Sequence, residues 1–246
     1  MSHSISIFDV NPNLDTKDLA ERFAHKRRIQ IKHVLTDRSA KALRDGLASQ
    51  TPWGAAMQAG DGQPRDFRME ELRDAKGASA AREMMQQVHQ ASAKGSYGFR
   101  YARYPLVKAY QERWHPGSLH EVLIEHINTP PFLDLVRTVT QCPELVKADG
   151  QVTMFGPQHY LGKHQDQQLE EGWIIAYVLN MTSVDWHPDW GGYLLFYDDD
   201  GDVIDGYMPR FNTLNLFAVP QHHAVSYVPP HAPPGRISIS GWFRDR

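Results

Sequence analysis

Residues 236–243 read RISISGWF, a run in which polar and apolar side chains alternate. This period of two is typical of a strand with one buried face. From residue 148 onward, similar short runs are separated by turn residues such as Gly, Pro and Asp. The eight runs cover 151–156, 159–166, 173–180, 191–197, 202–208, 213–217, 223–228 and 236–243. Eight short strands with such turns predict a sandwich or a barrel.

The preceding part of the chain is expected to be mainly helical, with one strand over 28–35. Apolar side chains recur there at helical spacing behind residues that can satisfy the free N–H groups of a first turn. Helices are expected behind Asp15, Thr36, Ser118 and Thr129, and over 80–91. By contrast, residues 48–78 contain Gly, Pro and few periodic apolar residues, so they predict a long loop or lid.

Helices first and strands later predict an α+β fold, with helices packed on a sheet. We expect one domain over 1–246. In it, 1–147 provide mainly helical support and substrate-side loops, and 148–246 provide the strand core.

Composition excludes several classes of protein. The net charge of -3 provides no strong field for nucleic acid or an anionic membrane. Cys142 is the only cysteine, which rules out an intramolecular disulfide and a cysteine-rich zinc site. No signal peptide and no apolar run of membrane-spanning length is visible. We therefore expect a soluble cytoplasmic protein with neither nucleic acid nor membrane as a partner.

His164 and Asp166 lie two residues apart in the predicted strand 159–166, so both side chains point to one face. A second histidine would complete a set of two imidazoles and one carboxylate. Such a set suits non-haem Fe(II) oxygenases, whose open positions accept a 2-oxo acid and dioxygen. His223 is the candidate for the third ligand and His222 is its competitor, because the alternation allows only one of them to face inward.

Arg236 follows His223 by thirteen positions on the last predicted strand. Its guanidinium group can bind the distal carboxylate of 2-oxoglutarate through paired, charge-assisted hydrogen bonds. Ser238 shares its face and is a candidate hydroxyl donor. Tyr177 is a candidate phenol donor to the same carboxylate, and Tyr160 is a weaker one.

Two segments, 155–166 and 216–243, resemble the 2-oxoglutarate/Fe(II)-dependent dioxygenases, specifically their prolyl 4-hydroxylase-like branch. The matching motifs are His164-x-Asp166, Gly191-Gly192-Tyr193-Leu194, His223-x-Val225 and the run 236–243. The resemblance implies a double-stranded β-helix, or jelly-roll, core with supporting N-terminal helices.

The resemblance also implies particular roles and cofactors. It favours His223 over His222 as the third ligand, and Tyr177 matches a tyrosine that binds the carboxylate of 2-oxoglutarate. The implied cofactors and co-substrates are Fe(II), 2-oxoglutarate and O2, with ascorbate as a reductant. Two segments depart from the family pattern: 223–236 is long and rich in proline, and 180–191 carries Trp186, His187 and Trp190.

The implied activity is hydroxylation of an unactivated C–H bond in a small-molecule or peptidyl substrate, with a prolyl or other amino-acid-type substrate preferred. One alternative is a hydroxylase of an unrelated small metabolite. Another is a non-catalytic, cupin-like protein that binds or senses 2-oxoglutarate. The presence of His164, Asp166, His223 and Arg236 argues against the last alternative, because a binding module needs no open iron face. The sequence leaves the oligomeric state open.

Overall fold

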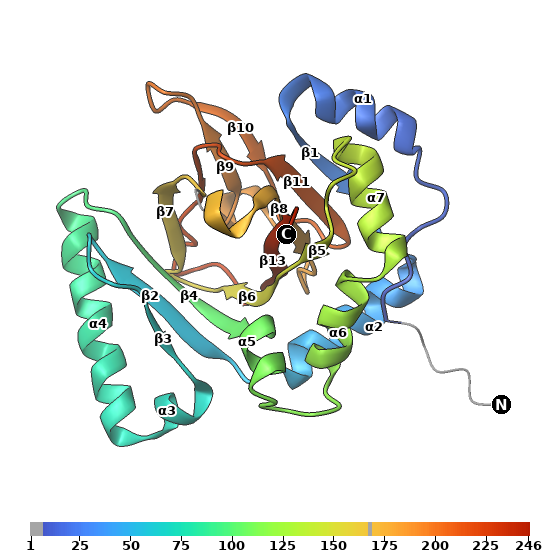
Figure 1. Ribbon diagram of the computed structural model, residues 1–246. Helices are drawn as coiled ribbons and strands as arrows, with labels where there is room; N and C mark the ends of the chain where they lie inside the picture. Colours follow the sequence, from blue (N-terminus) through green and yellow to red (C-terminus); the bar gives the residue numbers. More distant parts are fainter. Residues whose placement is uncertain (1–6, 167–168) are drawn as a thin grey trace.

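The structure is a computed structural model that describes residues 7–166 and 169–246. In these residues, thirteen strands form one antiparallel, barrel-like sheet that is accompanied by seven α-helices (Figure 1). This arrangement confirms the predicted α+β class and the jelly-roll core. The strands are β1 (Arg28–Lys32), β2 (Gly54–Ala59), β3 (Arg65–Phe67), β4 (Gly98–Pro105), β5 (Lys147–Ala148), β6 (Gln151–Phe155), β7 (Tyr160–His164), β8 (Trp173–Asn180), β9 (Leu194–Tyr197), β10 (Val203–Tyr207), β11 (Thr213–Ala218), β12 (His223–Val225) and β13 (Arg236–Arg244).

The order of the strands in the sheet is β1-β11-β8-β13-β6-β4-β7-β12-β9-β10, with β2 joined to β4, β3 to β2 and β5 to β13. All eight strands predicted after residue 148 are present. The two ends of the sheet meet through ion pairs: Asp205 on β10 lies 2.9 Å from Nε of Arg28 on β1 and 3.2 Å from Nζ of Lys26. The sheet is therefore nearly closed.

Most of the helices gather on one side of the sheet, where Figure 1 shows α1, α2, α6 and α7. The helices are α1 (Thr16–Lys26), α2 (Asp37–Gln50), α3 (Met69–Arg73), α4 (Ala75–Ala93), α5 (Leu106–Gln111), α6 (Leu119–Ile127) and α7 (Pro130–Thr140). Alternate side chains of β13, including Ile237, Ile239 and Phe243, enter the apolar core beneath these helices. The ring of Phe132 on α7 packs on Phe243 at a centroid distance of 5.9 Å.

The predicted helix starts are confirmed. Side chains of Asp15, Thr36 and Ser118 accept hydrogen bonds from the first-turn N–H groups of α1, α2 and α6. Thr129 precedes α7 as well, but there the helix begins with two prolines and has no side-chain cap. Proline tolerates this position because its missing N–H would be unpaired in any case.

The predicted long loop over 48–78 is wrong. This segment contains the end of α2, strands β2 and β3, helix α3 and the start of α4. Strand β2 reads GAAMQA, and its small side chains give little strand signal. Its backbone pairs with β4 from Gly54, opposite Arg103, to Ala59, opposite Gly98. The backbones of β2 and β3 approach closely at Gly54, where a Cβ would lie 2.1 Å from the carbonyl oxygen of Phe67. The first half of the chain therefore supplies strands as well as helices.

Within the described part of the chain, no helix combines the length and the apolar character needed to cross a membrane.

One buried side chain ties the N-terminal segment to the sheet. Asn212 is 1% exposed. Its Oδ1 accepts from the backbone N–H of Leu35 at 3.0 Å, and its Nδ2 donates to the Leu35 carbonyl at 2.8 Å.

We expect Asn212→Ala to lower the free energy of unfolding by about 2–4 kcal/mol, because two buried backbone groups lose their partner. Urea unfolding measures this effect. Asn13→Ala, at an exposed side chain, is the control and should change stability by less than about 0.5 kcal/mol. Equal losses in the two variants would contradict the interpretation.

Candidate active site

Strand pairing brings the three predicted metal ligands together. His164 ends β7 and His223 begins β12, and these neighbouring strands place the two residues directly opposite each other. Asp166 follows two residues after His164. Its Oδ1 lies 3.5 Å from Nε2 of His164, and its Oδ2 lies 3.5 Å from Nε2 of His223. One potential ligand atom from each residue lies within 4.8 Å of the other two.

Hydrogen bonds orient both imidazoles. Nδ1 of His164 lies 2.9 Å from the carbonyl oxygen of Gly162, and Nδ1 of His223 lies 2.9 Å from that of Gln221. Because a carbonyl only accepts, each Nδ1 carries the proton. Each Nε2 therefore keeps a free lone pair that faces Asp166, which is the arrangement that metal-binding histidines use.

The charge states also suit a cation. Burial, followed by the neighbouring His164, lowers the pKa of His223 to about 4, so this imidazole is neutral near pH 7. Burial acts to raise the pKa of Asp166, but the contacts of its carboxylate with the imidazoles of His164 and His223 and with the indole N–H of Trp242 outweigh burial, and the net pKa is lowered. A neutral imidazole beside an ionised carboxylate is a donor set that binds a metal without first releasing protons.

His222 does not join this cluster. Among the described residues, the group that could hold a metal ion consists of His164, Asp166 and His223. His222 is half-buried, and its Nδ1 has no hydrogen-bond partner among the described residues. His223 thus faces the cluster from the first position of β12, whereas His222 precedes the strand and lies outside the cluster.

The three residues line one part of a pocket, and Arg236 lines another part of it. Arg236 is 2% exposed, and its Nε donates to the carbonyl oxygen of Gly192 at 2.6 Å. Its guanidinium carbon lies 4.5 Å from the centroid of the Phe155 ring. Gly192 adopts a φ of +66°, and a Cβ there would lie 2.8 Å from Cδ of Arg236. The Gly191-Gly192 motif thus makes room for this arginine.

The guanidinium group retains an unused donor. Nη1 of Arg236 is buried and has no hydrogen-bond partner among the described residues. Burial lowers the pKa of Arg236 to about 9, so the group remains cationic at neutral pH. A buried cation with a free N–H is costly unless an anion binds it. Its surroundings therefore fit the carboxylate of a bound ligand.

Polar side chains from β6 and β13 continue the pocket beside Arg236. The hydroxyl groups of Ser238 and Thr153 lie 2.9 Å apart, and Nε2 of Gln151 lies 3.4 Å from Oγ of Ser240. Sequence reasoning included Ser238 but missed Thr153 and Gln151. The alternation in 151–156 puts Gln151 and Thr153 on one face of the strand. That this face is the one shared with Ser238 and Ser240 follows only from the pairing of β6 with β13.

The predicted tyrosine donors do not face Arg236. On β8, Tyr177 belongs to the core beneath the helices, and its hydroxyl donates to the carbonyl oxygen of Asp149 at 2.8 Å. Its strand neighbour Val178, which points to the other face, has no donor to offer. Tyr160 pairs its hydroxyl with that of Ser92 on α4. Neither phenol is therefore available for the role predicted from the sequence.

A row of aromatic side chains forms one wall of the pocket. Tyr97, Phe99, Tyr101 and Phe155 follow one another at centroid distances of 6.2, 5.4 and 5.0 Å. Tyr97 lies 6.2 Å from the ring of His164, and Phe155 packs against Arg236. The wall thus runs from the candidate metal ligands to the candidate anion anchor. Phe99 and Tyr101 are both buried and line this pocket.

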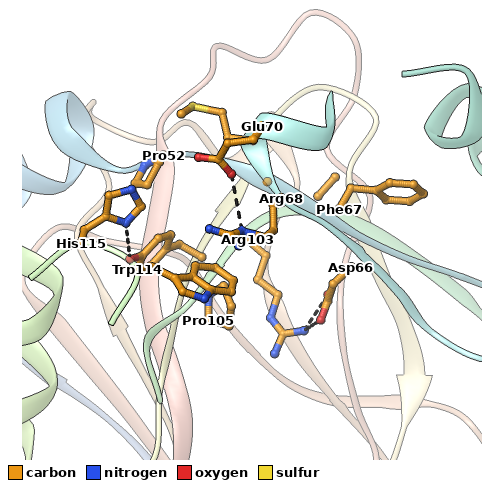
Figure 2. Close-up of a pocket in the computed structure, with 13 residues that line it drawn as sticks. Pro52, Asp66, Phe67, Arg68, Glu70, Arg103, Pro105, Trp114 and His115 are labelled. Atoms are coloured by element: carbon orange, nitrogen blue, oxygen red, sulfur yellow. Dashed lines mark hydrogen bonds and ion pairs between the residues drawn. The ribbon is translucent and has the colours of Figure 1, made fainter. Parts of the chain in front are cut away.

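A second pocket, shown in Figure 2, contains none of these groups. Its charged residues pair with one another: Arg103 with Asp66 at 2.7 Å, and Arg68 with Glu70 at 3.5 Å. His115 in turn is bonded to the hydroxyl of Tyr104 at 3.0 Å. These charged side chains of the pocket are therefore already engaged in ion pairs with one another.

Residues 150–244 match the model of a family described as the 2OG-Fe(II) oxygenase superfamily. This segment contains His164, Asp166, His223 and Arg236. The match confirms the predicted resemblance to this superfamily over residues 150–244. A search of curated proteins gave no match.

Several solved structures share the fold at low sequence identity. A Pseudomonas putida prolyl-4-hydroxylase aligns with 94% of this chain and 99% of its own, with 16% identity and a TM-score of 0.56. A 2OG-Fe(II) oxygenase family protein from Burkholderia pseudomallei aligns over 97% and 94%, with 11% identity and a TM-score of 0.57. AviO1 from Streptomyces viridochromogenes aligns over 95% and 96%, with 14% identity and a TM-score of 0.55. These similarities establish the fold of the chain.

The geometry around Arg236 predicts how three variants bind 2-oxoglutarate. Ser238→Ala should weaken binding several-fold, because one hydroxyl beside the anchor is lost. Arg236→Ala should weaken it about tenfold to a hundredfold, the range for losing a hydrogen-bonded charge. Tyr177→Phe should leave the Kd within about twofold, since its hydroxyl already serves Asp149. Anaerobic calorimetry measures all three. A Tyr177→Phe loss as large as that of Arg236→Ala would show that the phenol does reach the ligand.

Proposed function

We propose that this protein is an Fe(II)- and 2-oxoglutarate-dependent dioxygenase that hydroxylates an unactivated C–H bond. One observation carries the proposal: His164, Asp166 and His223 share a pocket with a buried Arg236 that has an unused N–H group. The first three residues fit a metal that needs open positions. The fourth fits an anion that would reach from those positions to the arginine. A binding protein without turnover would require only the fourth.

Each residue has a defined task in the proposed reaction. His164, Asp166 and His223 would hold Fe(II) on one face and leave the opposite face to ligands. Arg236, with Ser238 beside it, would bind and orient the distal carboxylate of 2-oxoglutarate. When bound, Fe(II) would supply the activation of O2, the oxidant, of which one oxygen atom ends in the succinate formed with CO2 from 2-oxoglutarate and the other in the hydroxylated product. The aromatic wall and the buried position of the site would exclude water from the reacting groups.

The pocket wall also favours a type of acceptor. Among the described residues that line it, Asp166 and Arg236 are the only Asp, Glu, Lys or Arg side chains, and both have assigned tasks. The remaining surface is aromatic, aliphatic or neutral polar, so a charged group next to the reacting carbon would be buried without an oppositely charged partner. A prolyl or other amino-acid-type residue within a peptide, or a neutral small molecule, satisfies this condition. A free amino acid does not.

We further propose that residues 1–246 act as one catalytic domain. The cytoplasmic location and the use of ascorbate stay predictions from the sequence.

An anaerobic titration with Fe(II) and 2-oxoglutarate tests the proposed function. We expect a weak visible charge-transfer band that develops only when both are present. His164→Ala should abolish the band, because only two ligands remain. Arg236→Ala should keep the band but shift its midpoint to about tenfold to a hundredfold higher 2-oxoglutarate. Removing the metal with a chelator should bleach the wild-type band. A folded wild-type protein that never shows the band would refute the proposal.

Matched acceptors test the inferred substrate type. Each amino acid is supplied once free and once as its N-acetyl amide, which removes both charges and leaves the side chain unchanged. Stimulated succinate release above the uncoupled rate is the readout. We expect stimulation by members of the capped set, and none by their free counterparts. Stimulation by the free compounds alone would overturn the inferred substrate type but leave the proposed oxygenase activity intact.

A further inference from the structure

Trp242 donates a hydrogen bond to one of the three candidate metal ligands. Its indole Nε1–H lies 2.9 Å from Oδ2 of Asp166. We propose that Trp242 is a positioning residue that fixes the orientation of the Asp166 carboxylate and directs a single oxygen, Oδ1, to the metal. This inference rests on the proposed function, because it assigns a role toward the Fe(II) that the function requires.

The carboxylate needs such support because of its place in the chain. Strand β7 ends at His164, so Asp166 lies beyond the last residue that the strand ladder holds. Among the described residues, the indole N–H of Trp242 donates to the Asp166 carboxylate, and the two histidines face that carboxylate with their Nε2 atoms. Without the indole N–H, the carboxylate could rotate about its own side-chain bonds.

The indole itself is held firmly. Trp242 lies on β13, paired with Ala176 of β8. Its ring stacks on Trp173, with a centroid distance of 3.8 Å and an interplanar angle of 3°. A donor fixed between a central strand and a parallel ring can impose its direction on a flexible acceptor. Groups that support ligands in this way tune metal affinity by about tenfold to a hundredfold.

The hydrogen bond distinguishes the two oxygens of Asp166. Oδ2 receives the indole N–H, which withdraws electron density and occupies a lone pair. Oδ1 faces Nε2 of His164 at 3.5 Å without that donor. Binding through Oδ1 alone leaves three metal positions for other ligands. A carboxylate that bound through both oxygens would occupy one of the positions that 2-oxoglutarate and dioxygen need.

The chain contains a matched control. Nε1 of Trp173 is buried and has no hydrogen-bond partner among the described residues. Trp173→Phe and Trp242→Phe therefore remove the same chemical group from the two halves of one ring stack. Only the second removes a hydrogen bond to Asp166. Any effect of lost ring area or weaker stacking should be common to both variants.

The experiment measures Fe(II) affinity by anaerobic competition with a chromogenic chelator, and the charge-transfer band with 2-oxoglutarate. We expect Trp242→Phe to weaken Fe(II) binding about tenfold to a hundredfold and to shift the band. Trp173→Phe should leave both near the wild-type values. Replacing Trp242 by its benzothienyl analogue, which has sulfur in place of the N–H group and keeps the ring size, should reproduce the phenylalanine effect in a fully stacked site.

The outcomes separate this inference from the proposed function. Suppose that the wild-type protein shows its band, and that Trp242→Phe and the benzothienyl protein both keep the wild-type Fe(II) affinity and band position. This result leaves the proposed function intact and overturns the role of Trp242. Equal losses in Trp242→Phe and Trp173→Phe, with none in the benzothienyl protein, also overturn it, because stacking would then be the cause. Absence of a band in the wild-type protein refutes the oxygenase itself.

Discussion

The alternation of side chains along β13 is the constraint on which the rest of the structure depends. This strand lies between β8 and β6, so both of its edges are paired and its register is fixed. One face sends Ile237, Ile239 and Phe243 into the core beneath the helices. The other face sends Arg236, Ser238 and Trp242 into the pocket. A slip of one residue would bury the polar set among the helices and expose the apolar set, so the folding core and the site specify the same register.

This coupling also explains how a costly set of polar groups is tolerated in the interior. Asp166, His223 and Arg236 are all buried, and burial alone disfavours the charged form of each. Asp166 is compensated by two imidazoles and an indole N–H, whereas Arg236 keeps an N–H without a partner. This N–H group of Arg236 lies where the carboxylate of a bound ligand would accept its hydrogen bond. Strain of this kind is expected at functional sites, which the surrounding core must stabilise.

The sequence predicted those features for which local pattern and chemistry agree. The strands after residue 148 and the capped helices follow from periodicity and capping. The pairing of His164 with Asp166 follows from ligand chemistry and spacing, and the choice of His223 over His222 follows from the resemblance to the dioxygenases. The face of β8 could not be predicted, because Trp173–Asn180 reads WIIAYVLN and is apolar on both sides. Tyr177 was therefore assigned to the wrong face. Strand β2 was missed because Gly and Ala carry no strand signal, and because its partner β4 is distant in the sequence, with Gly54 opposite Arg103 and Ala59 opposite Gly98.

The division of the pocket between the two parts of the chain limits what the family match can reveal. The matched segment, 150–244, holds the candidate metal ligands and Arg236, which would bind cofactors common to the family. Tyr97, Phe99 and Tyr101 lie outside it, on β4 and the residue before it. Yet β4 is inserted between β6 and β7, so the aromatic wall stands directly beside His164. For the proposed reaction, the C-terminal strands would thus provide the chemistry. Discrimination among acceptors would depend on a strand that the N-terminal half contributes to the same sheet.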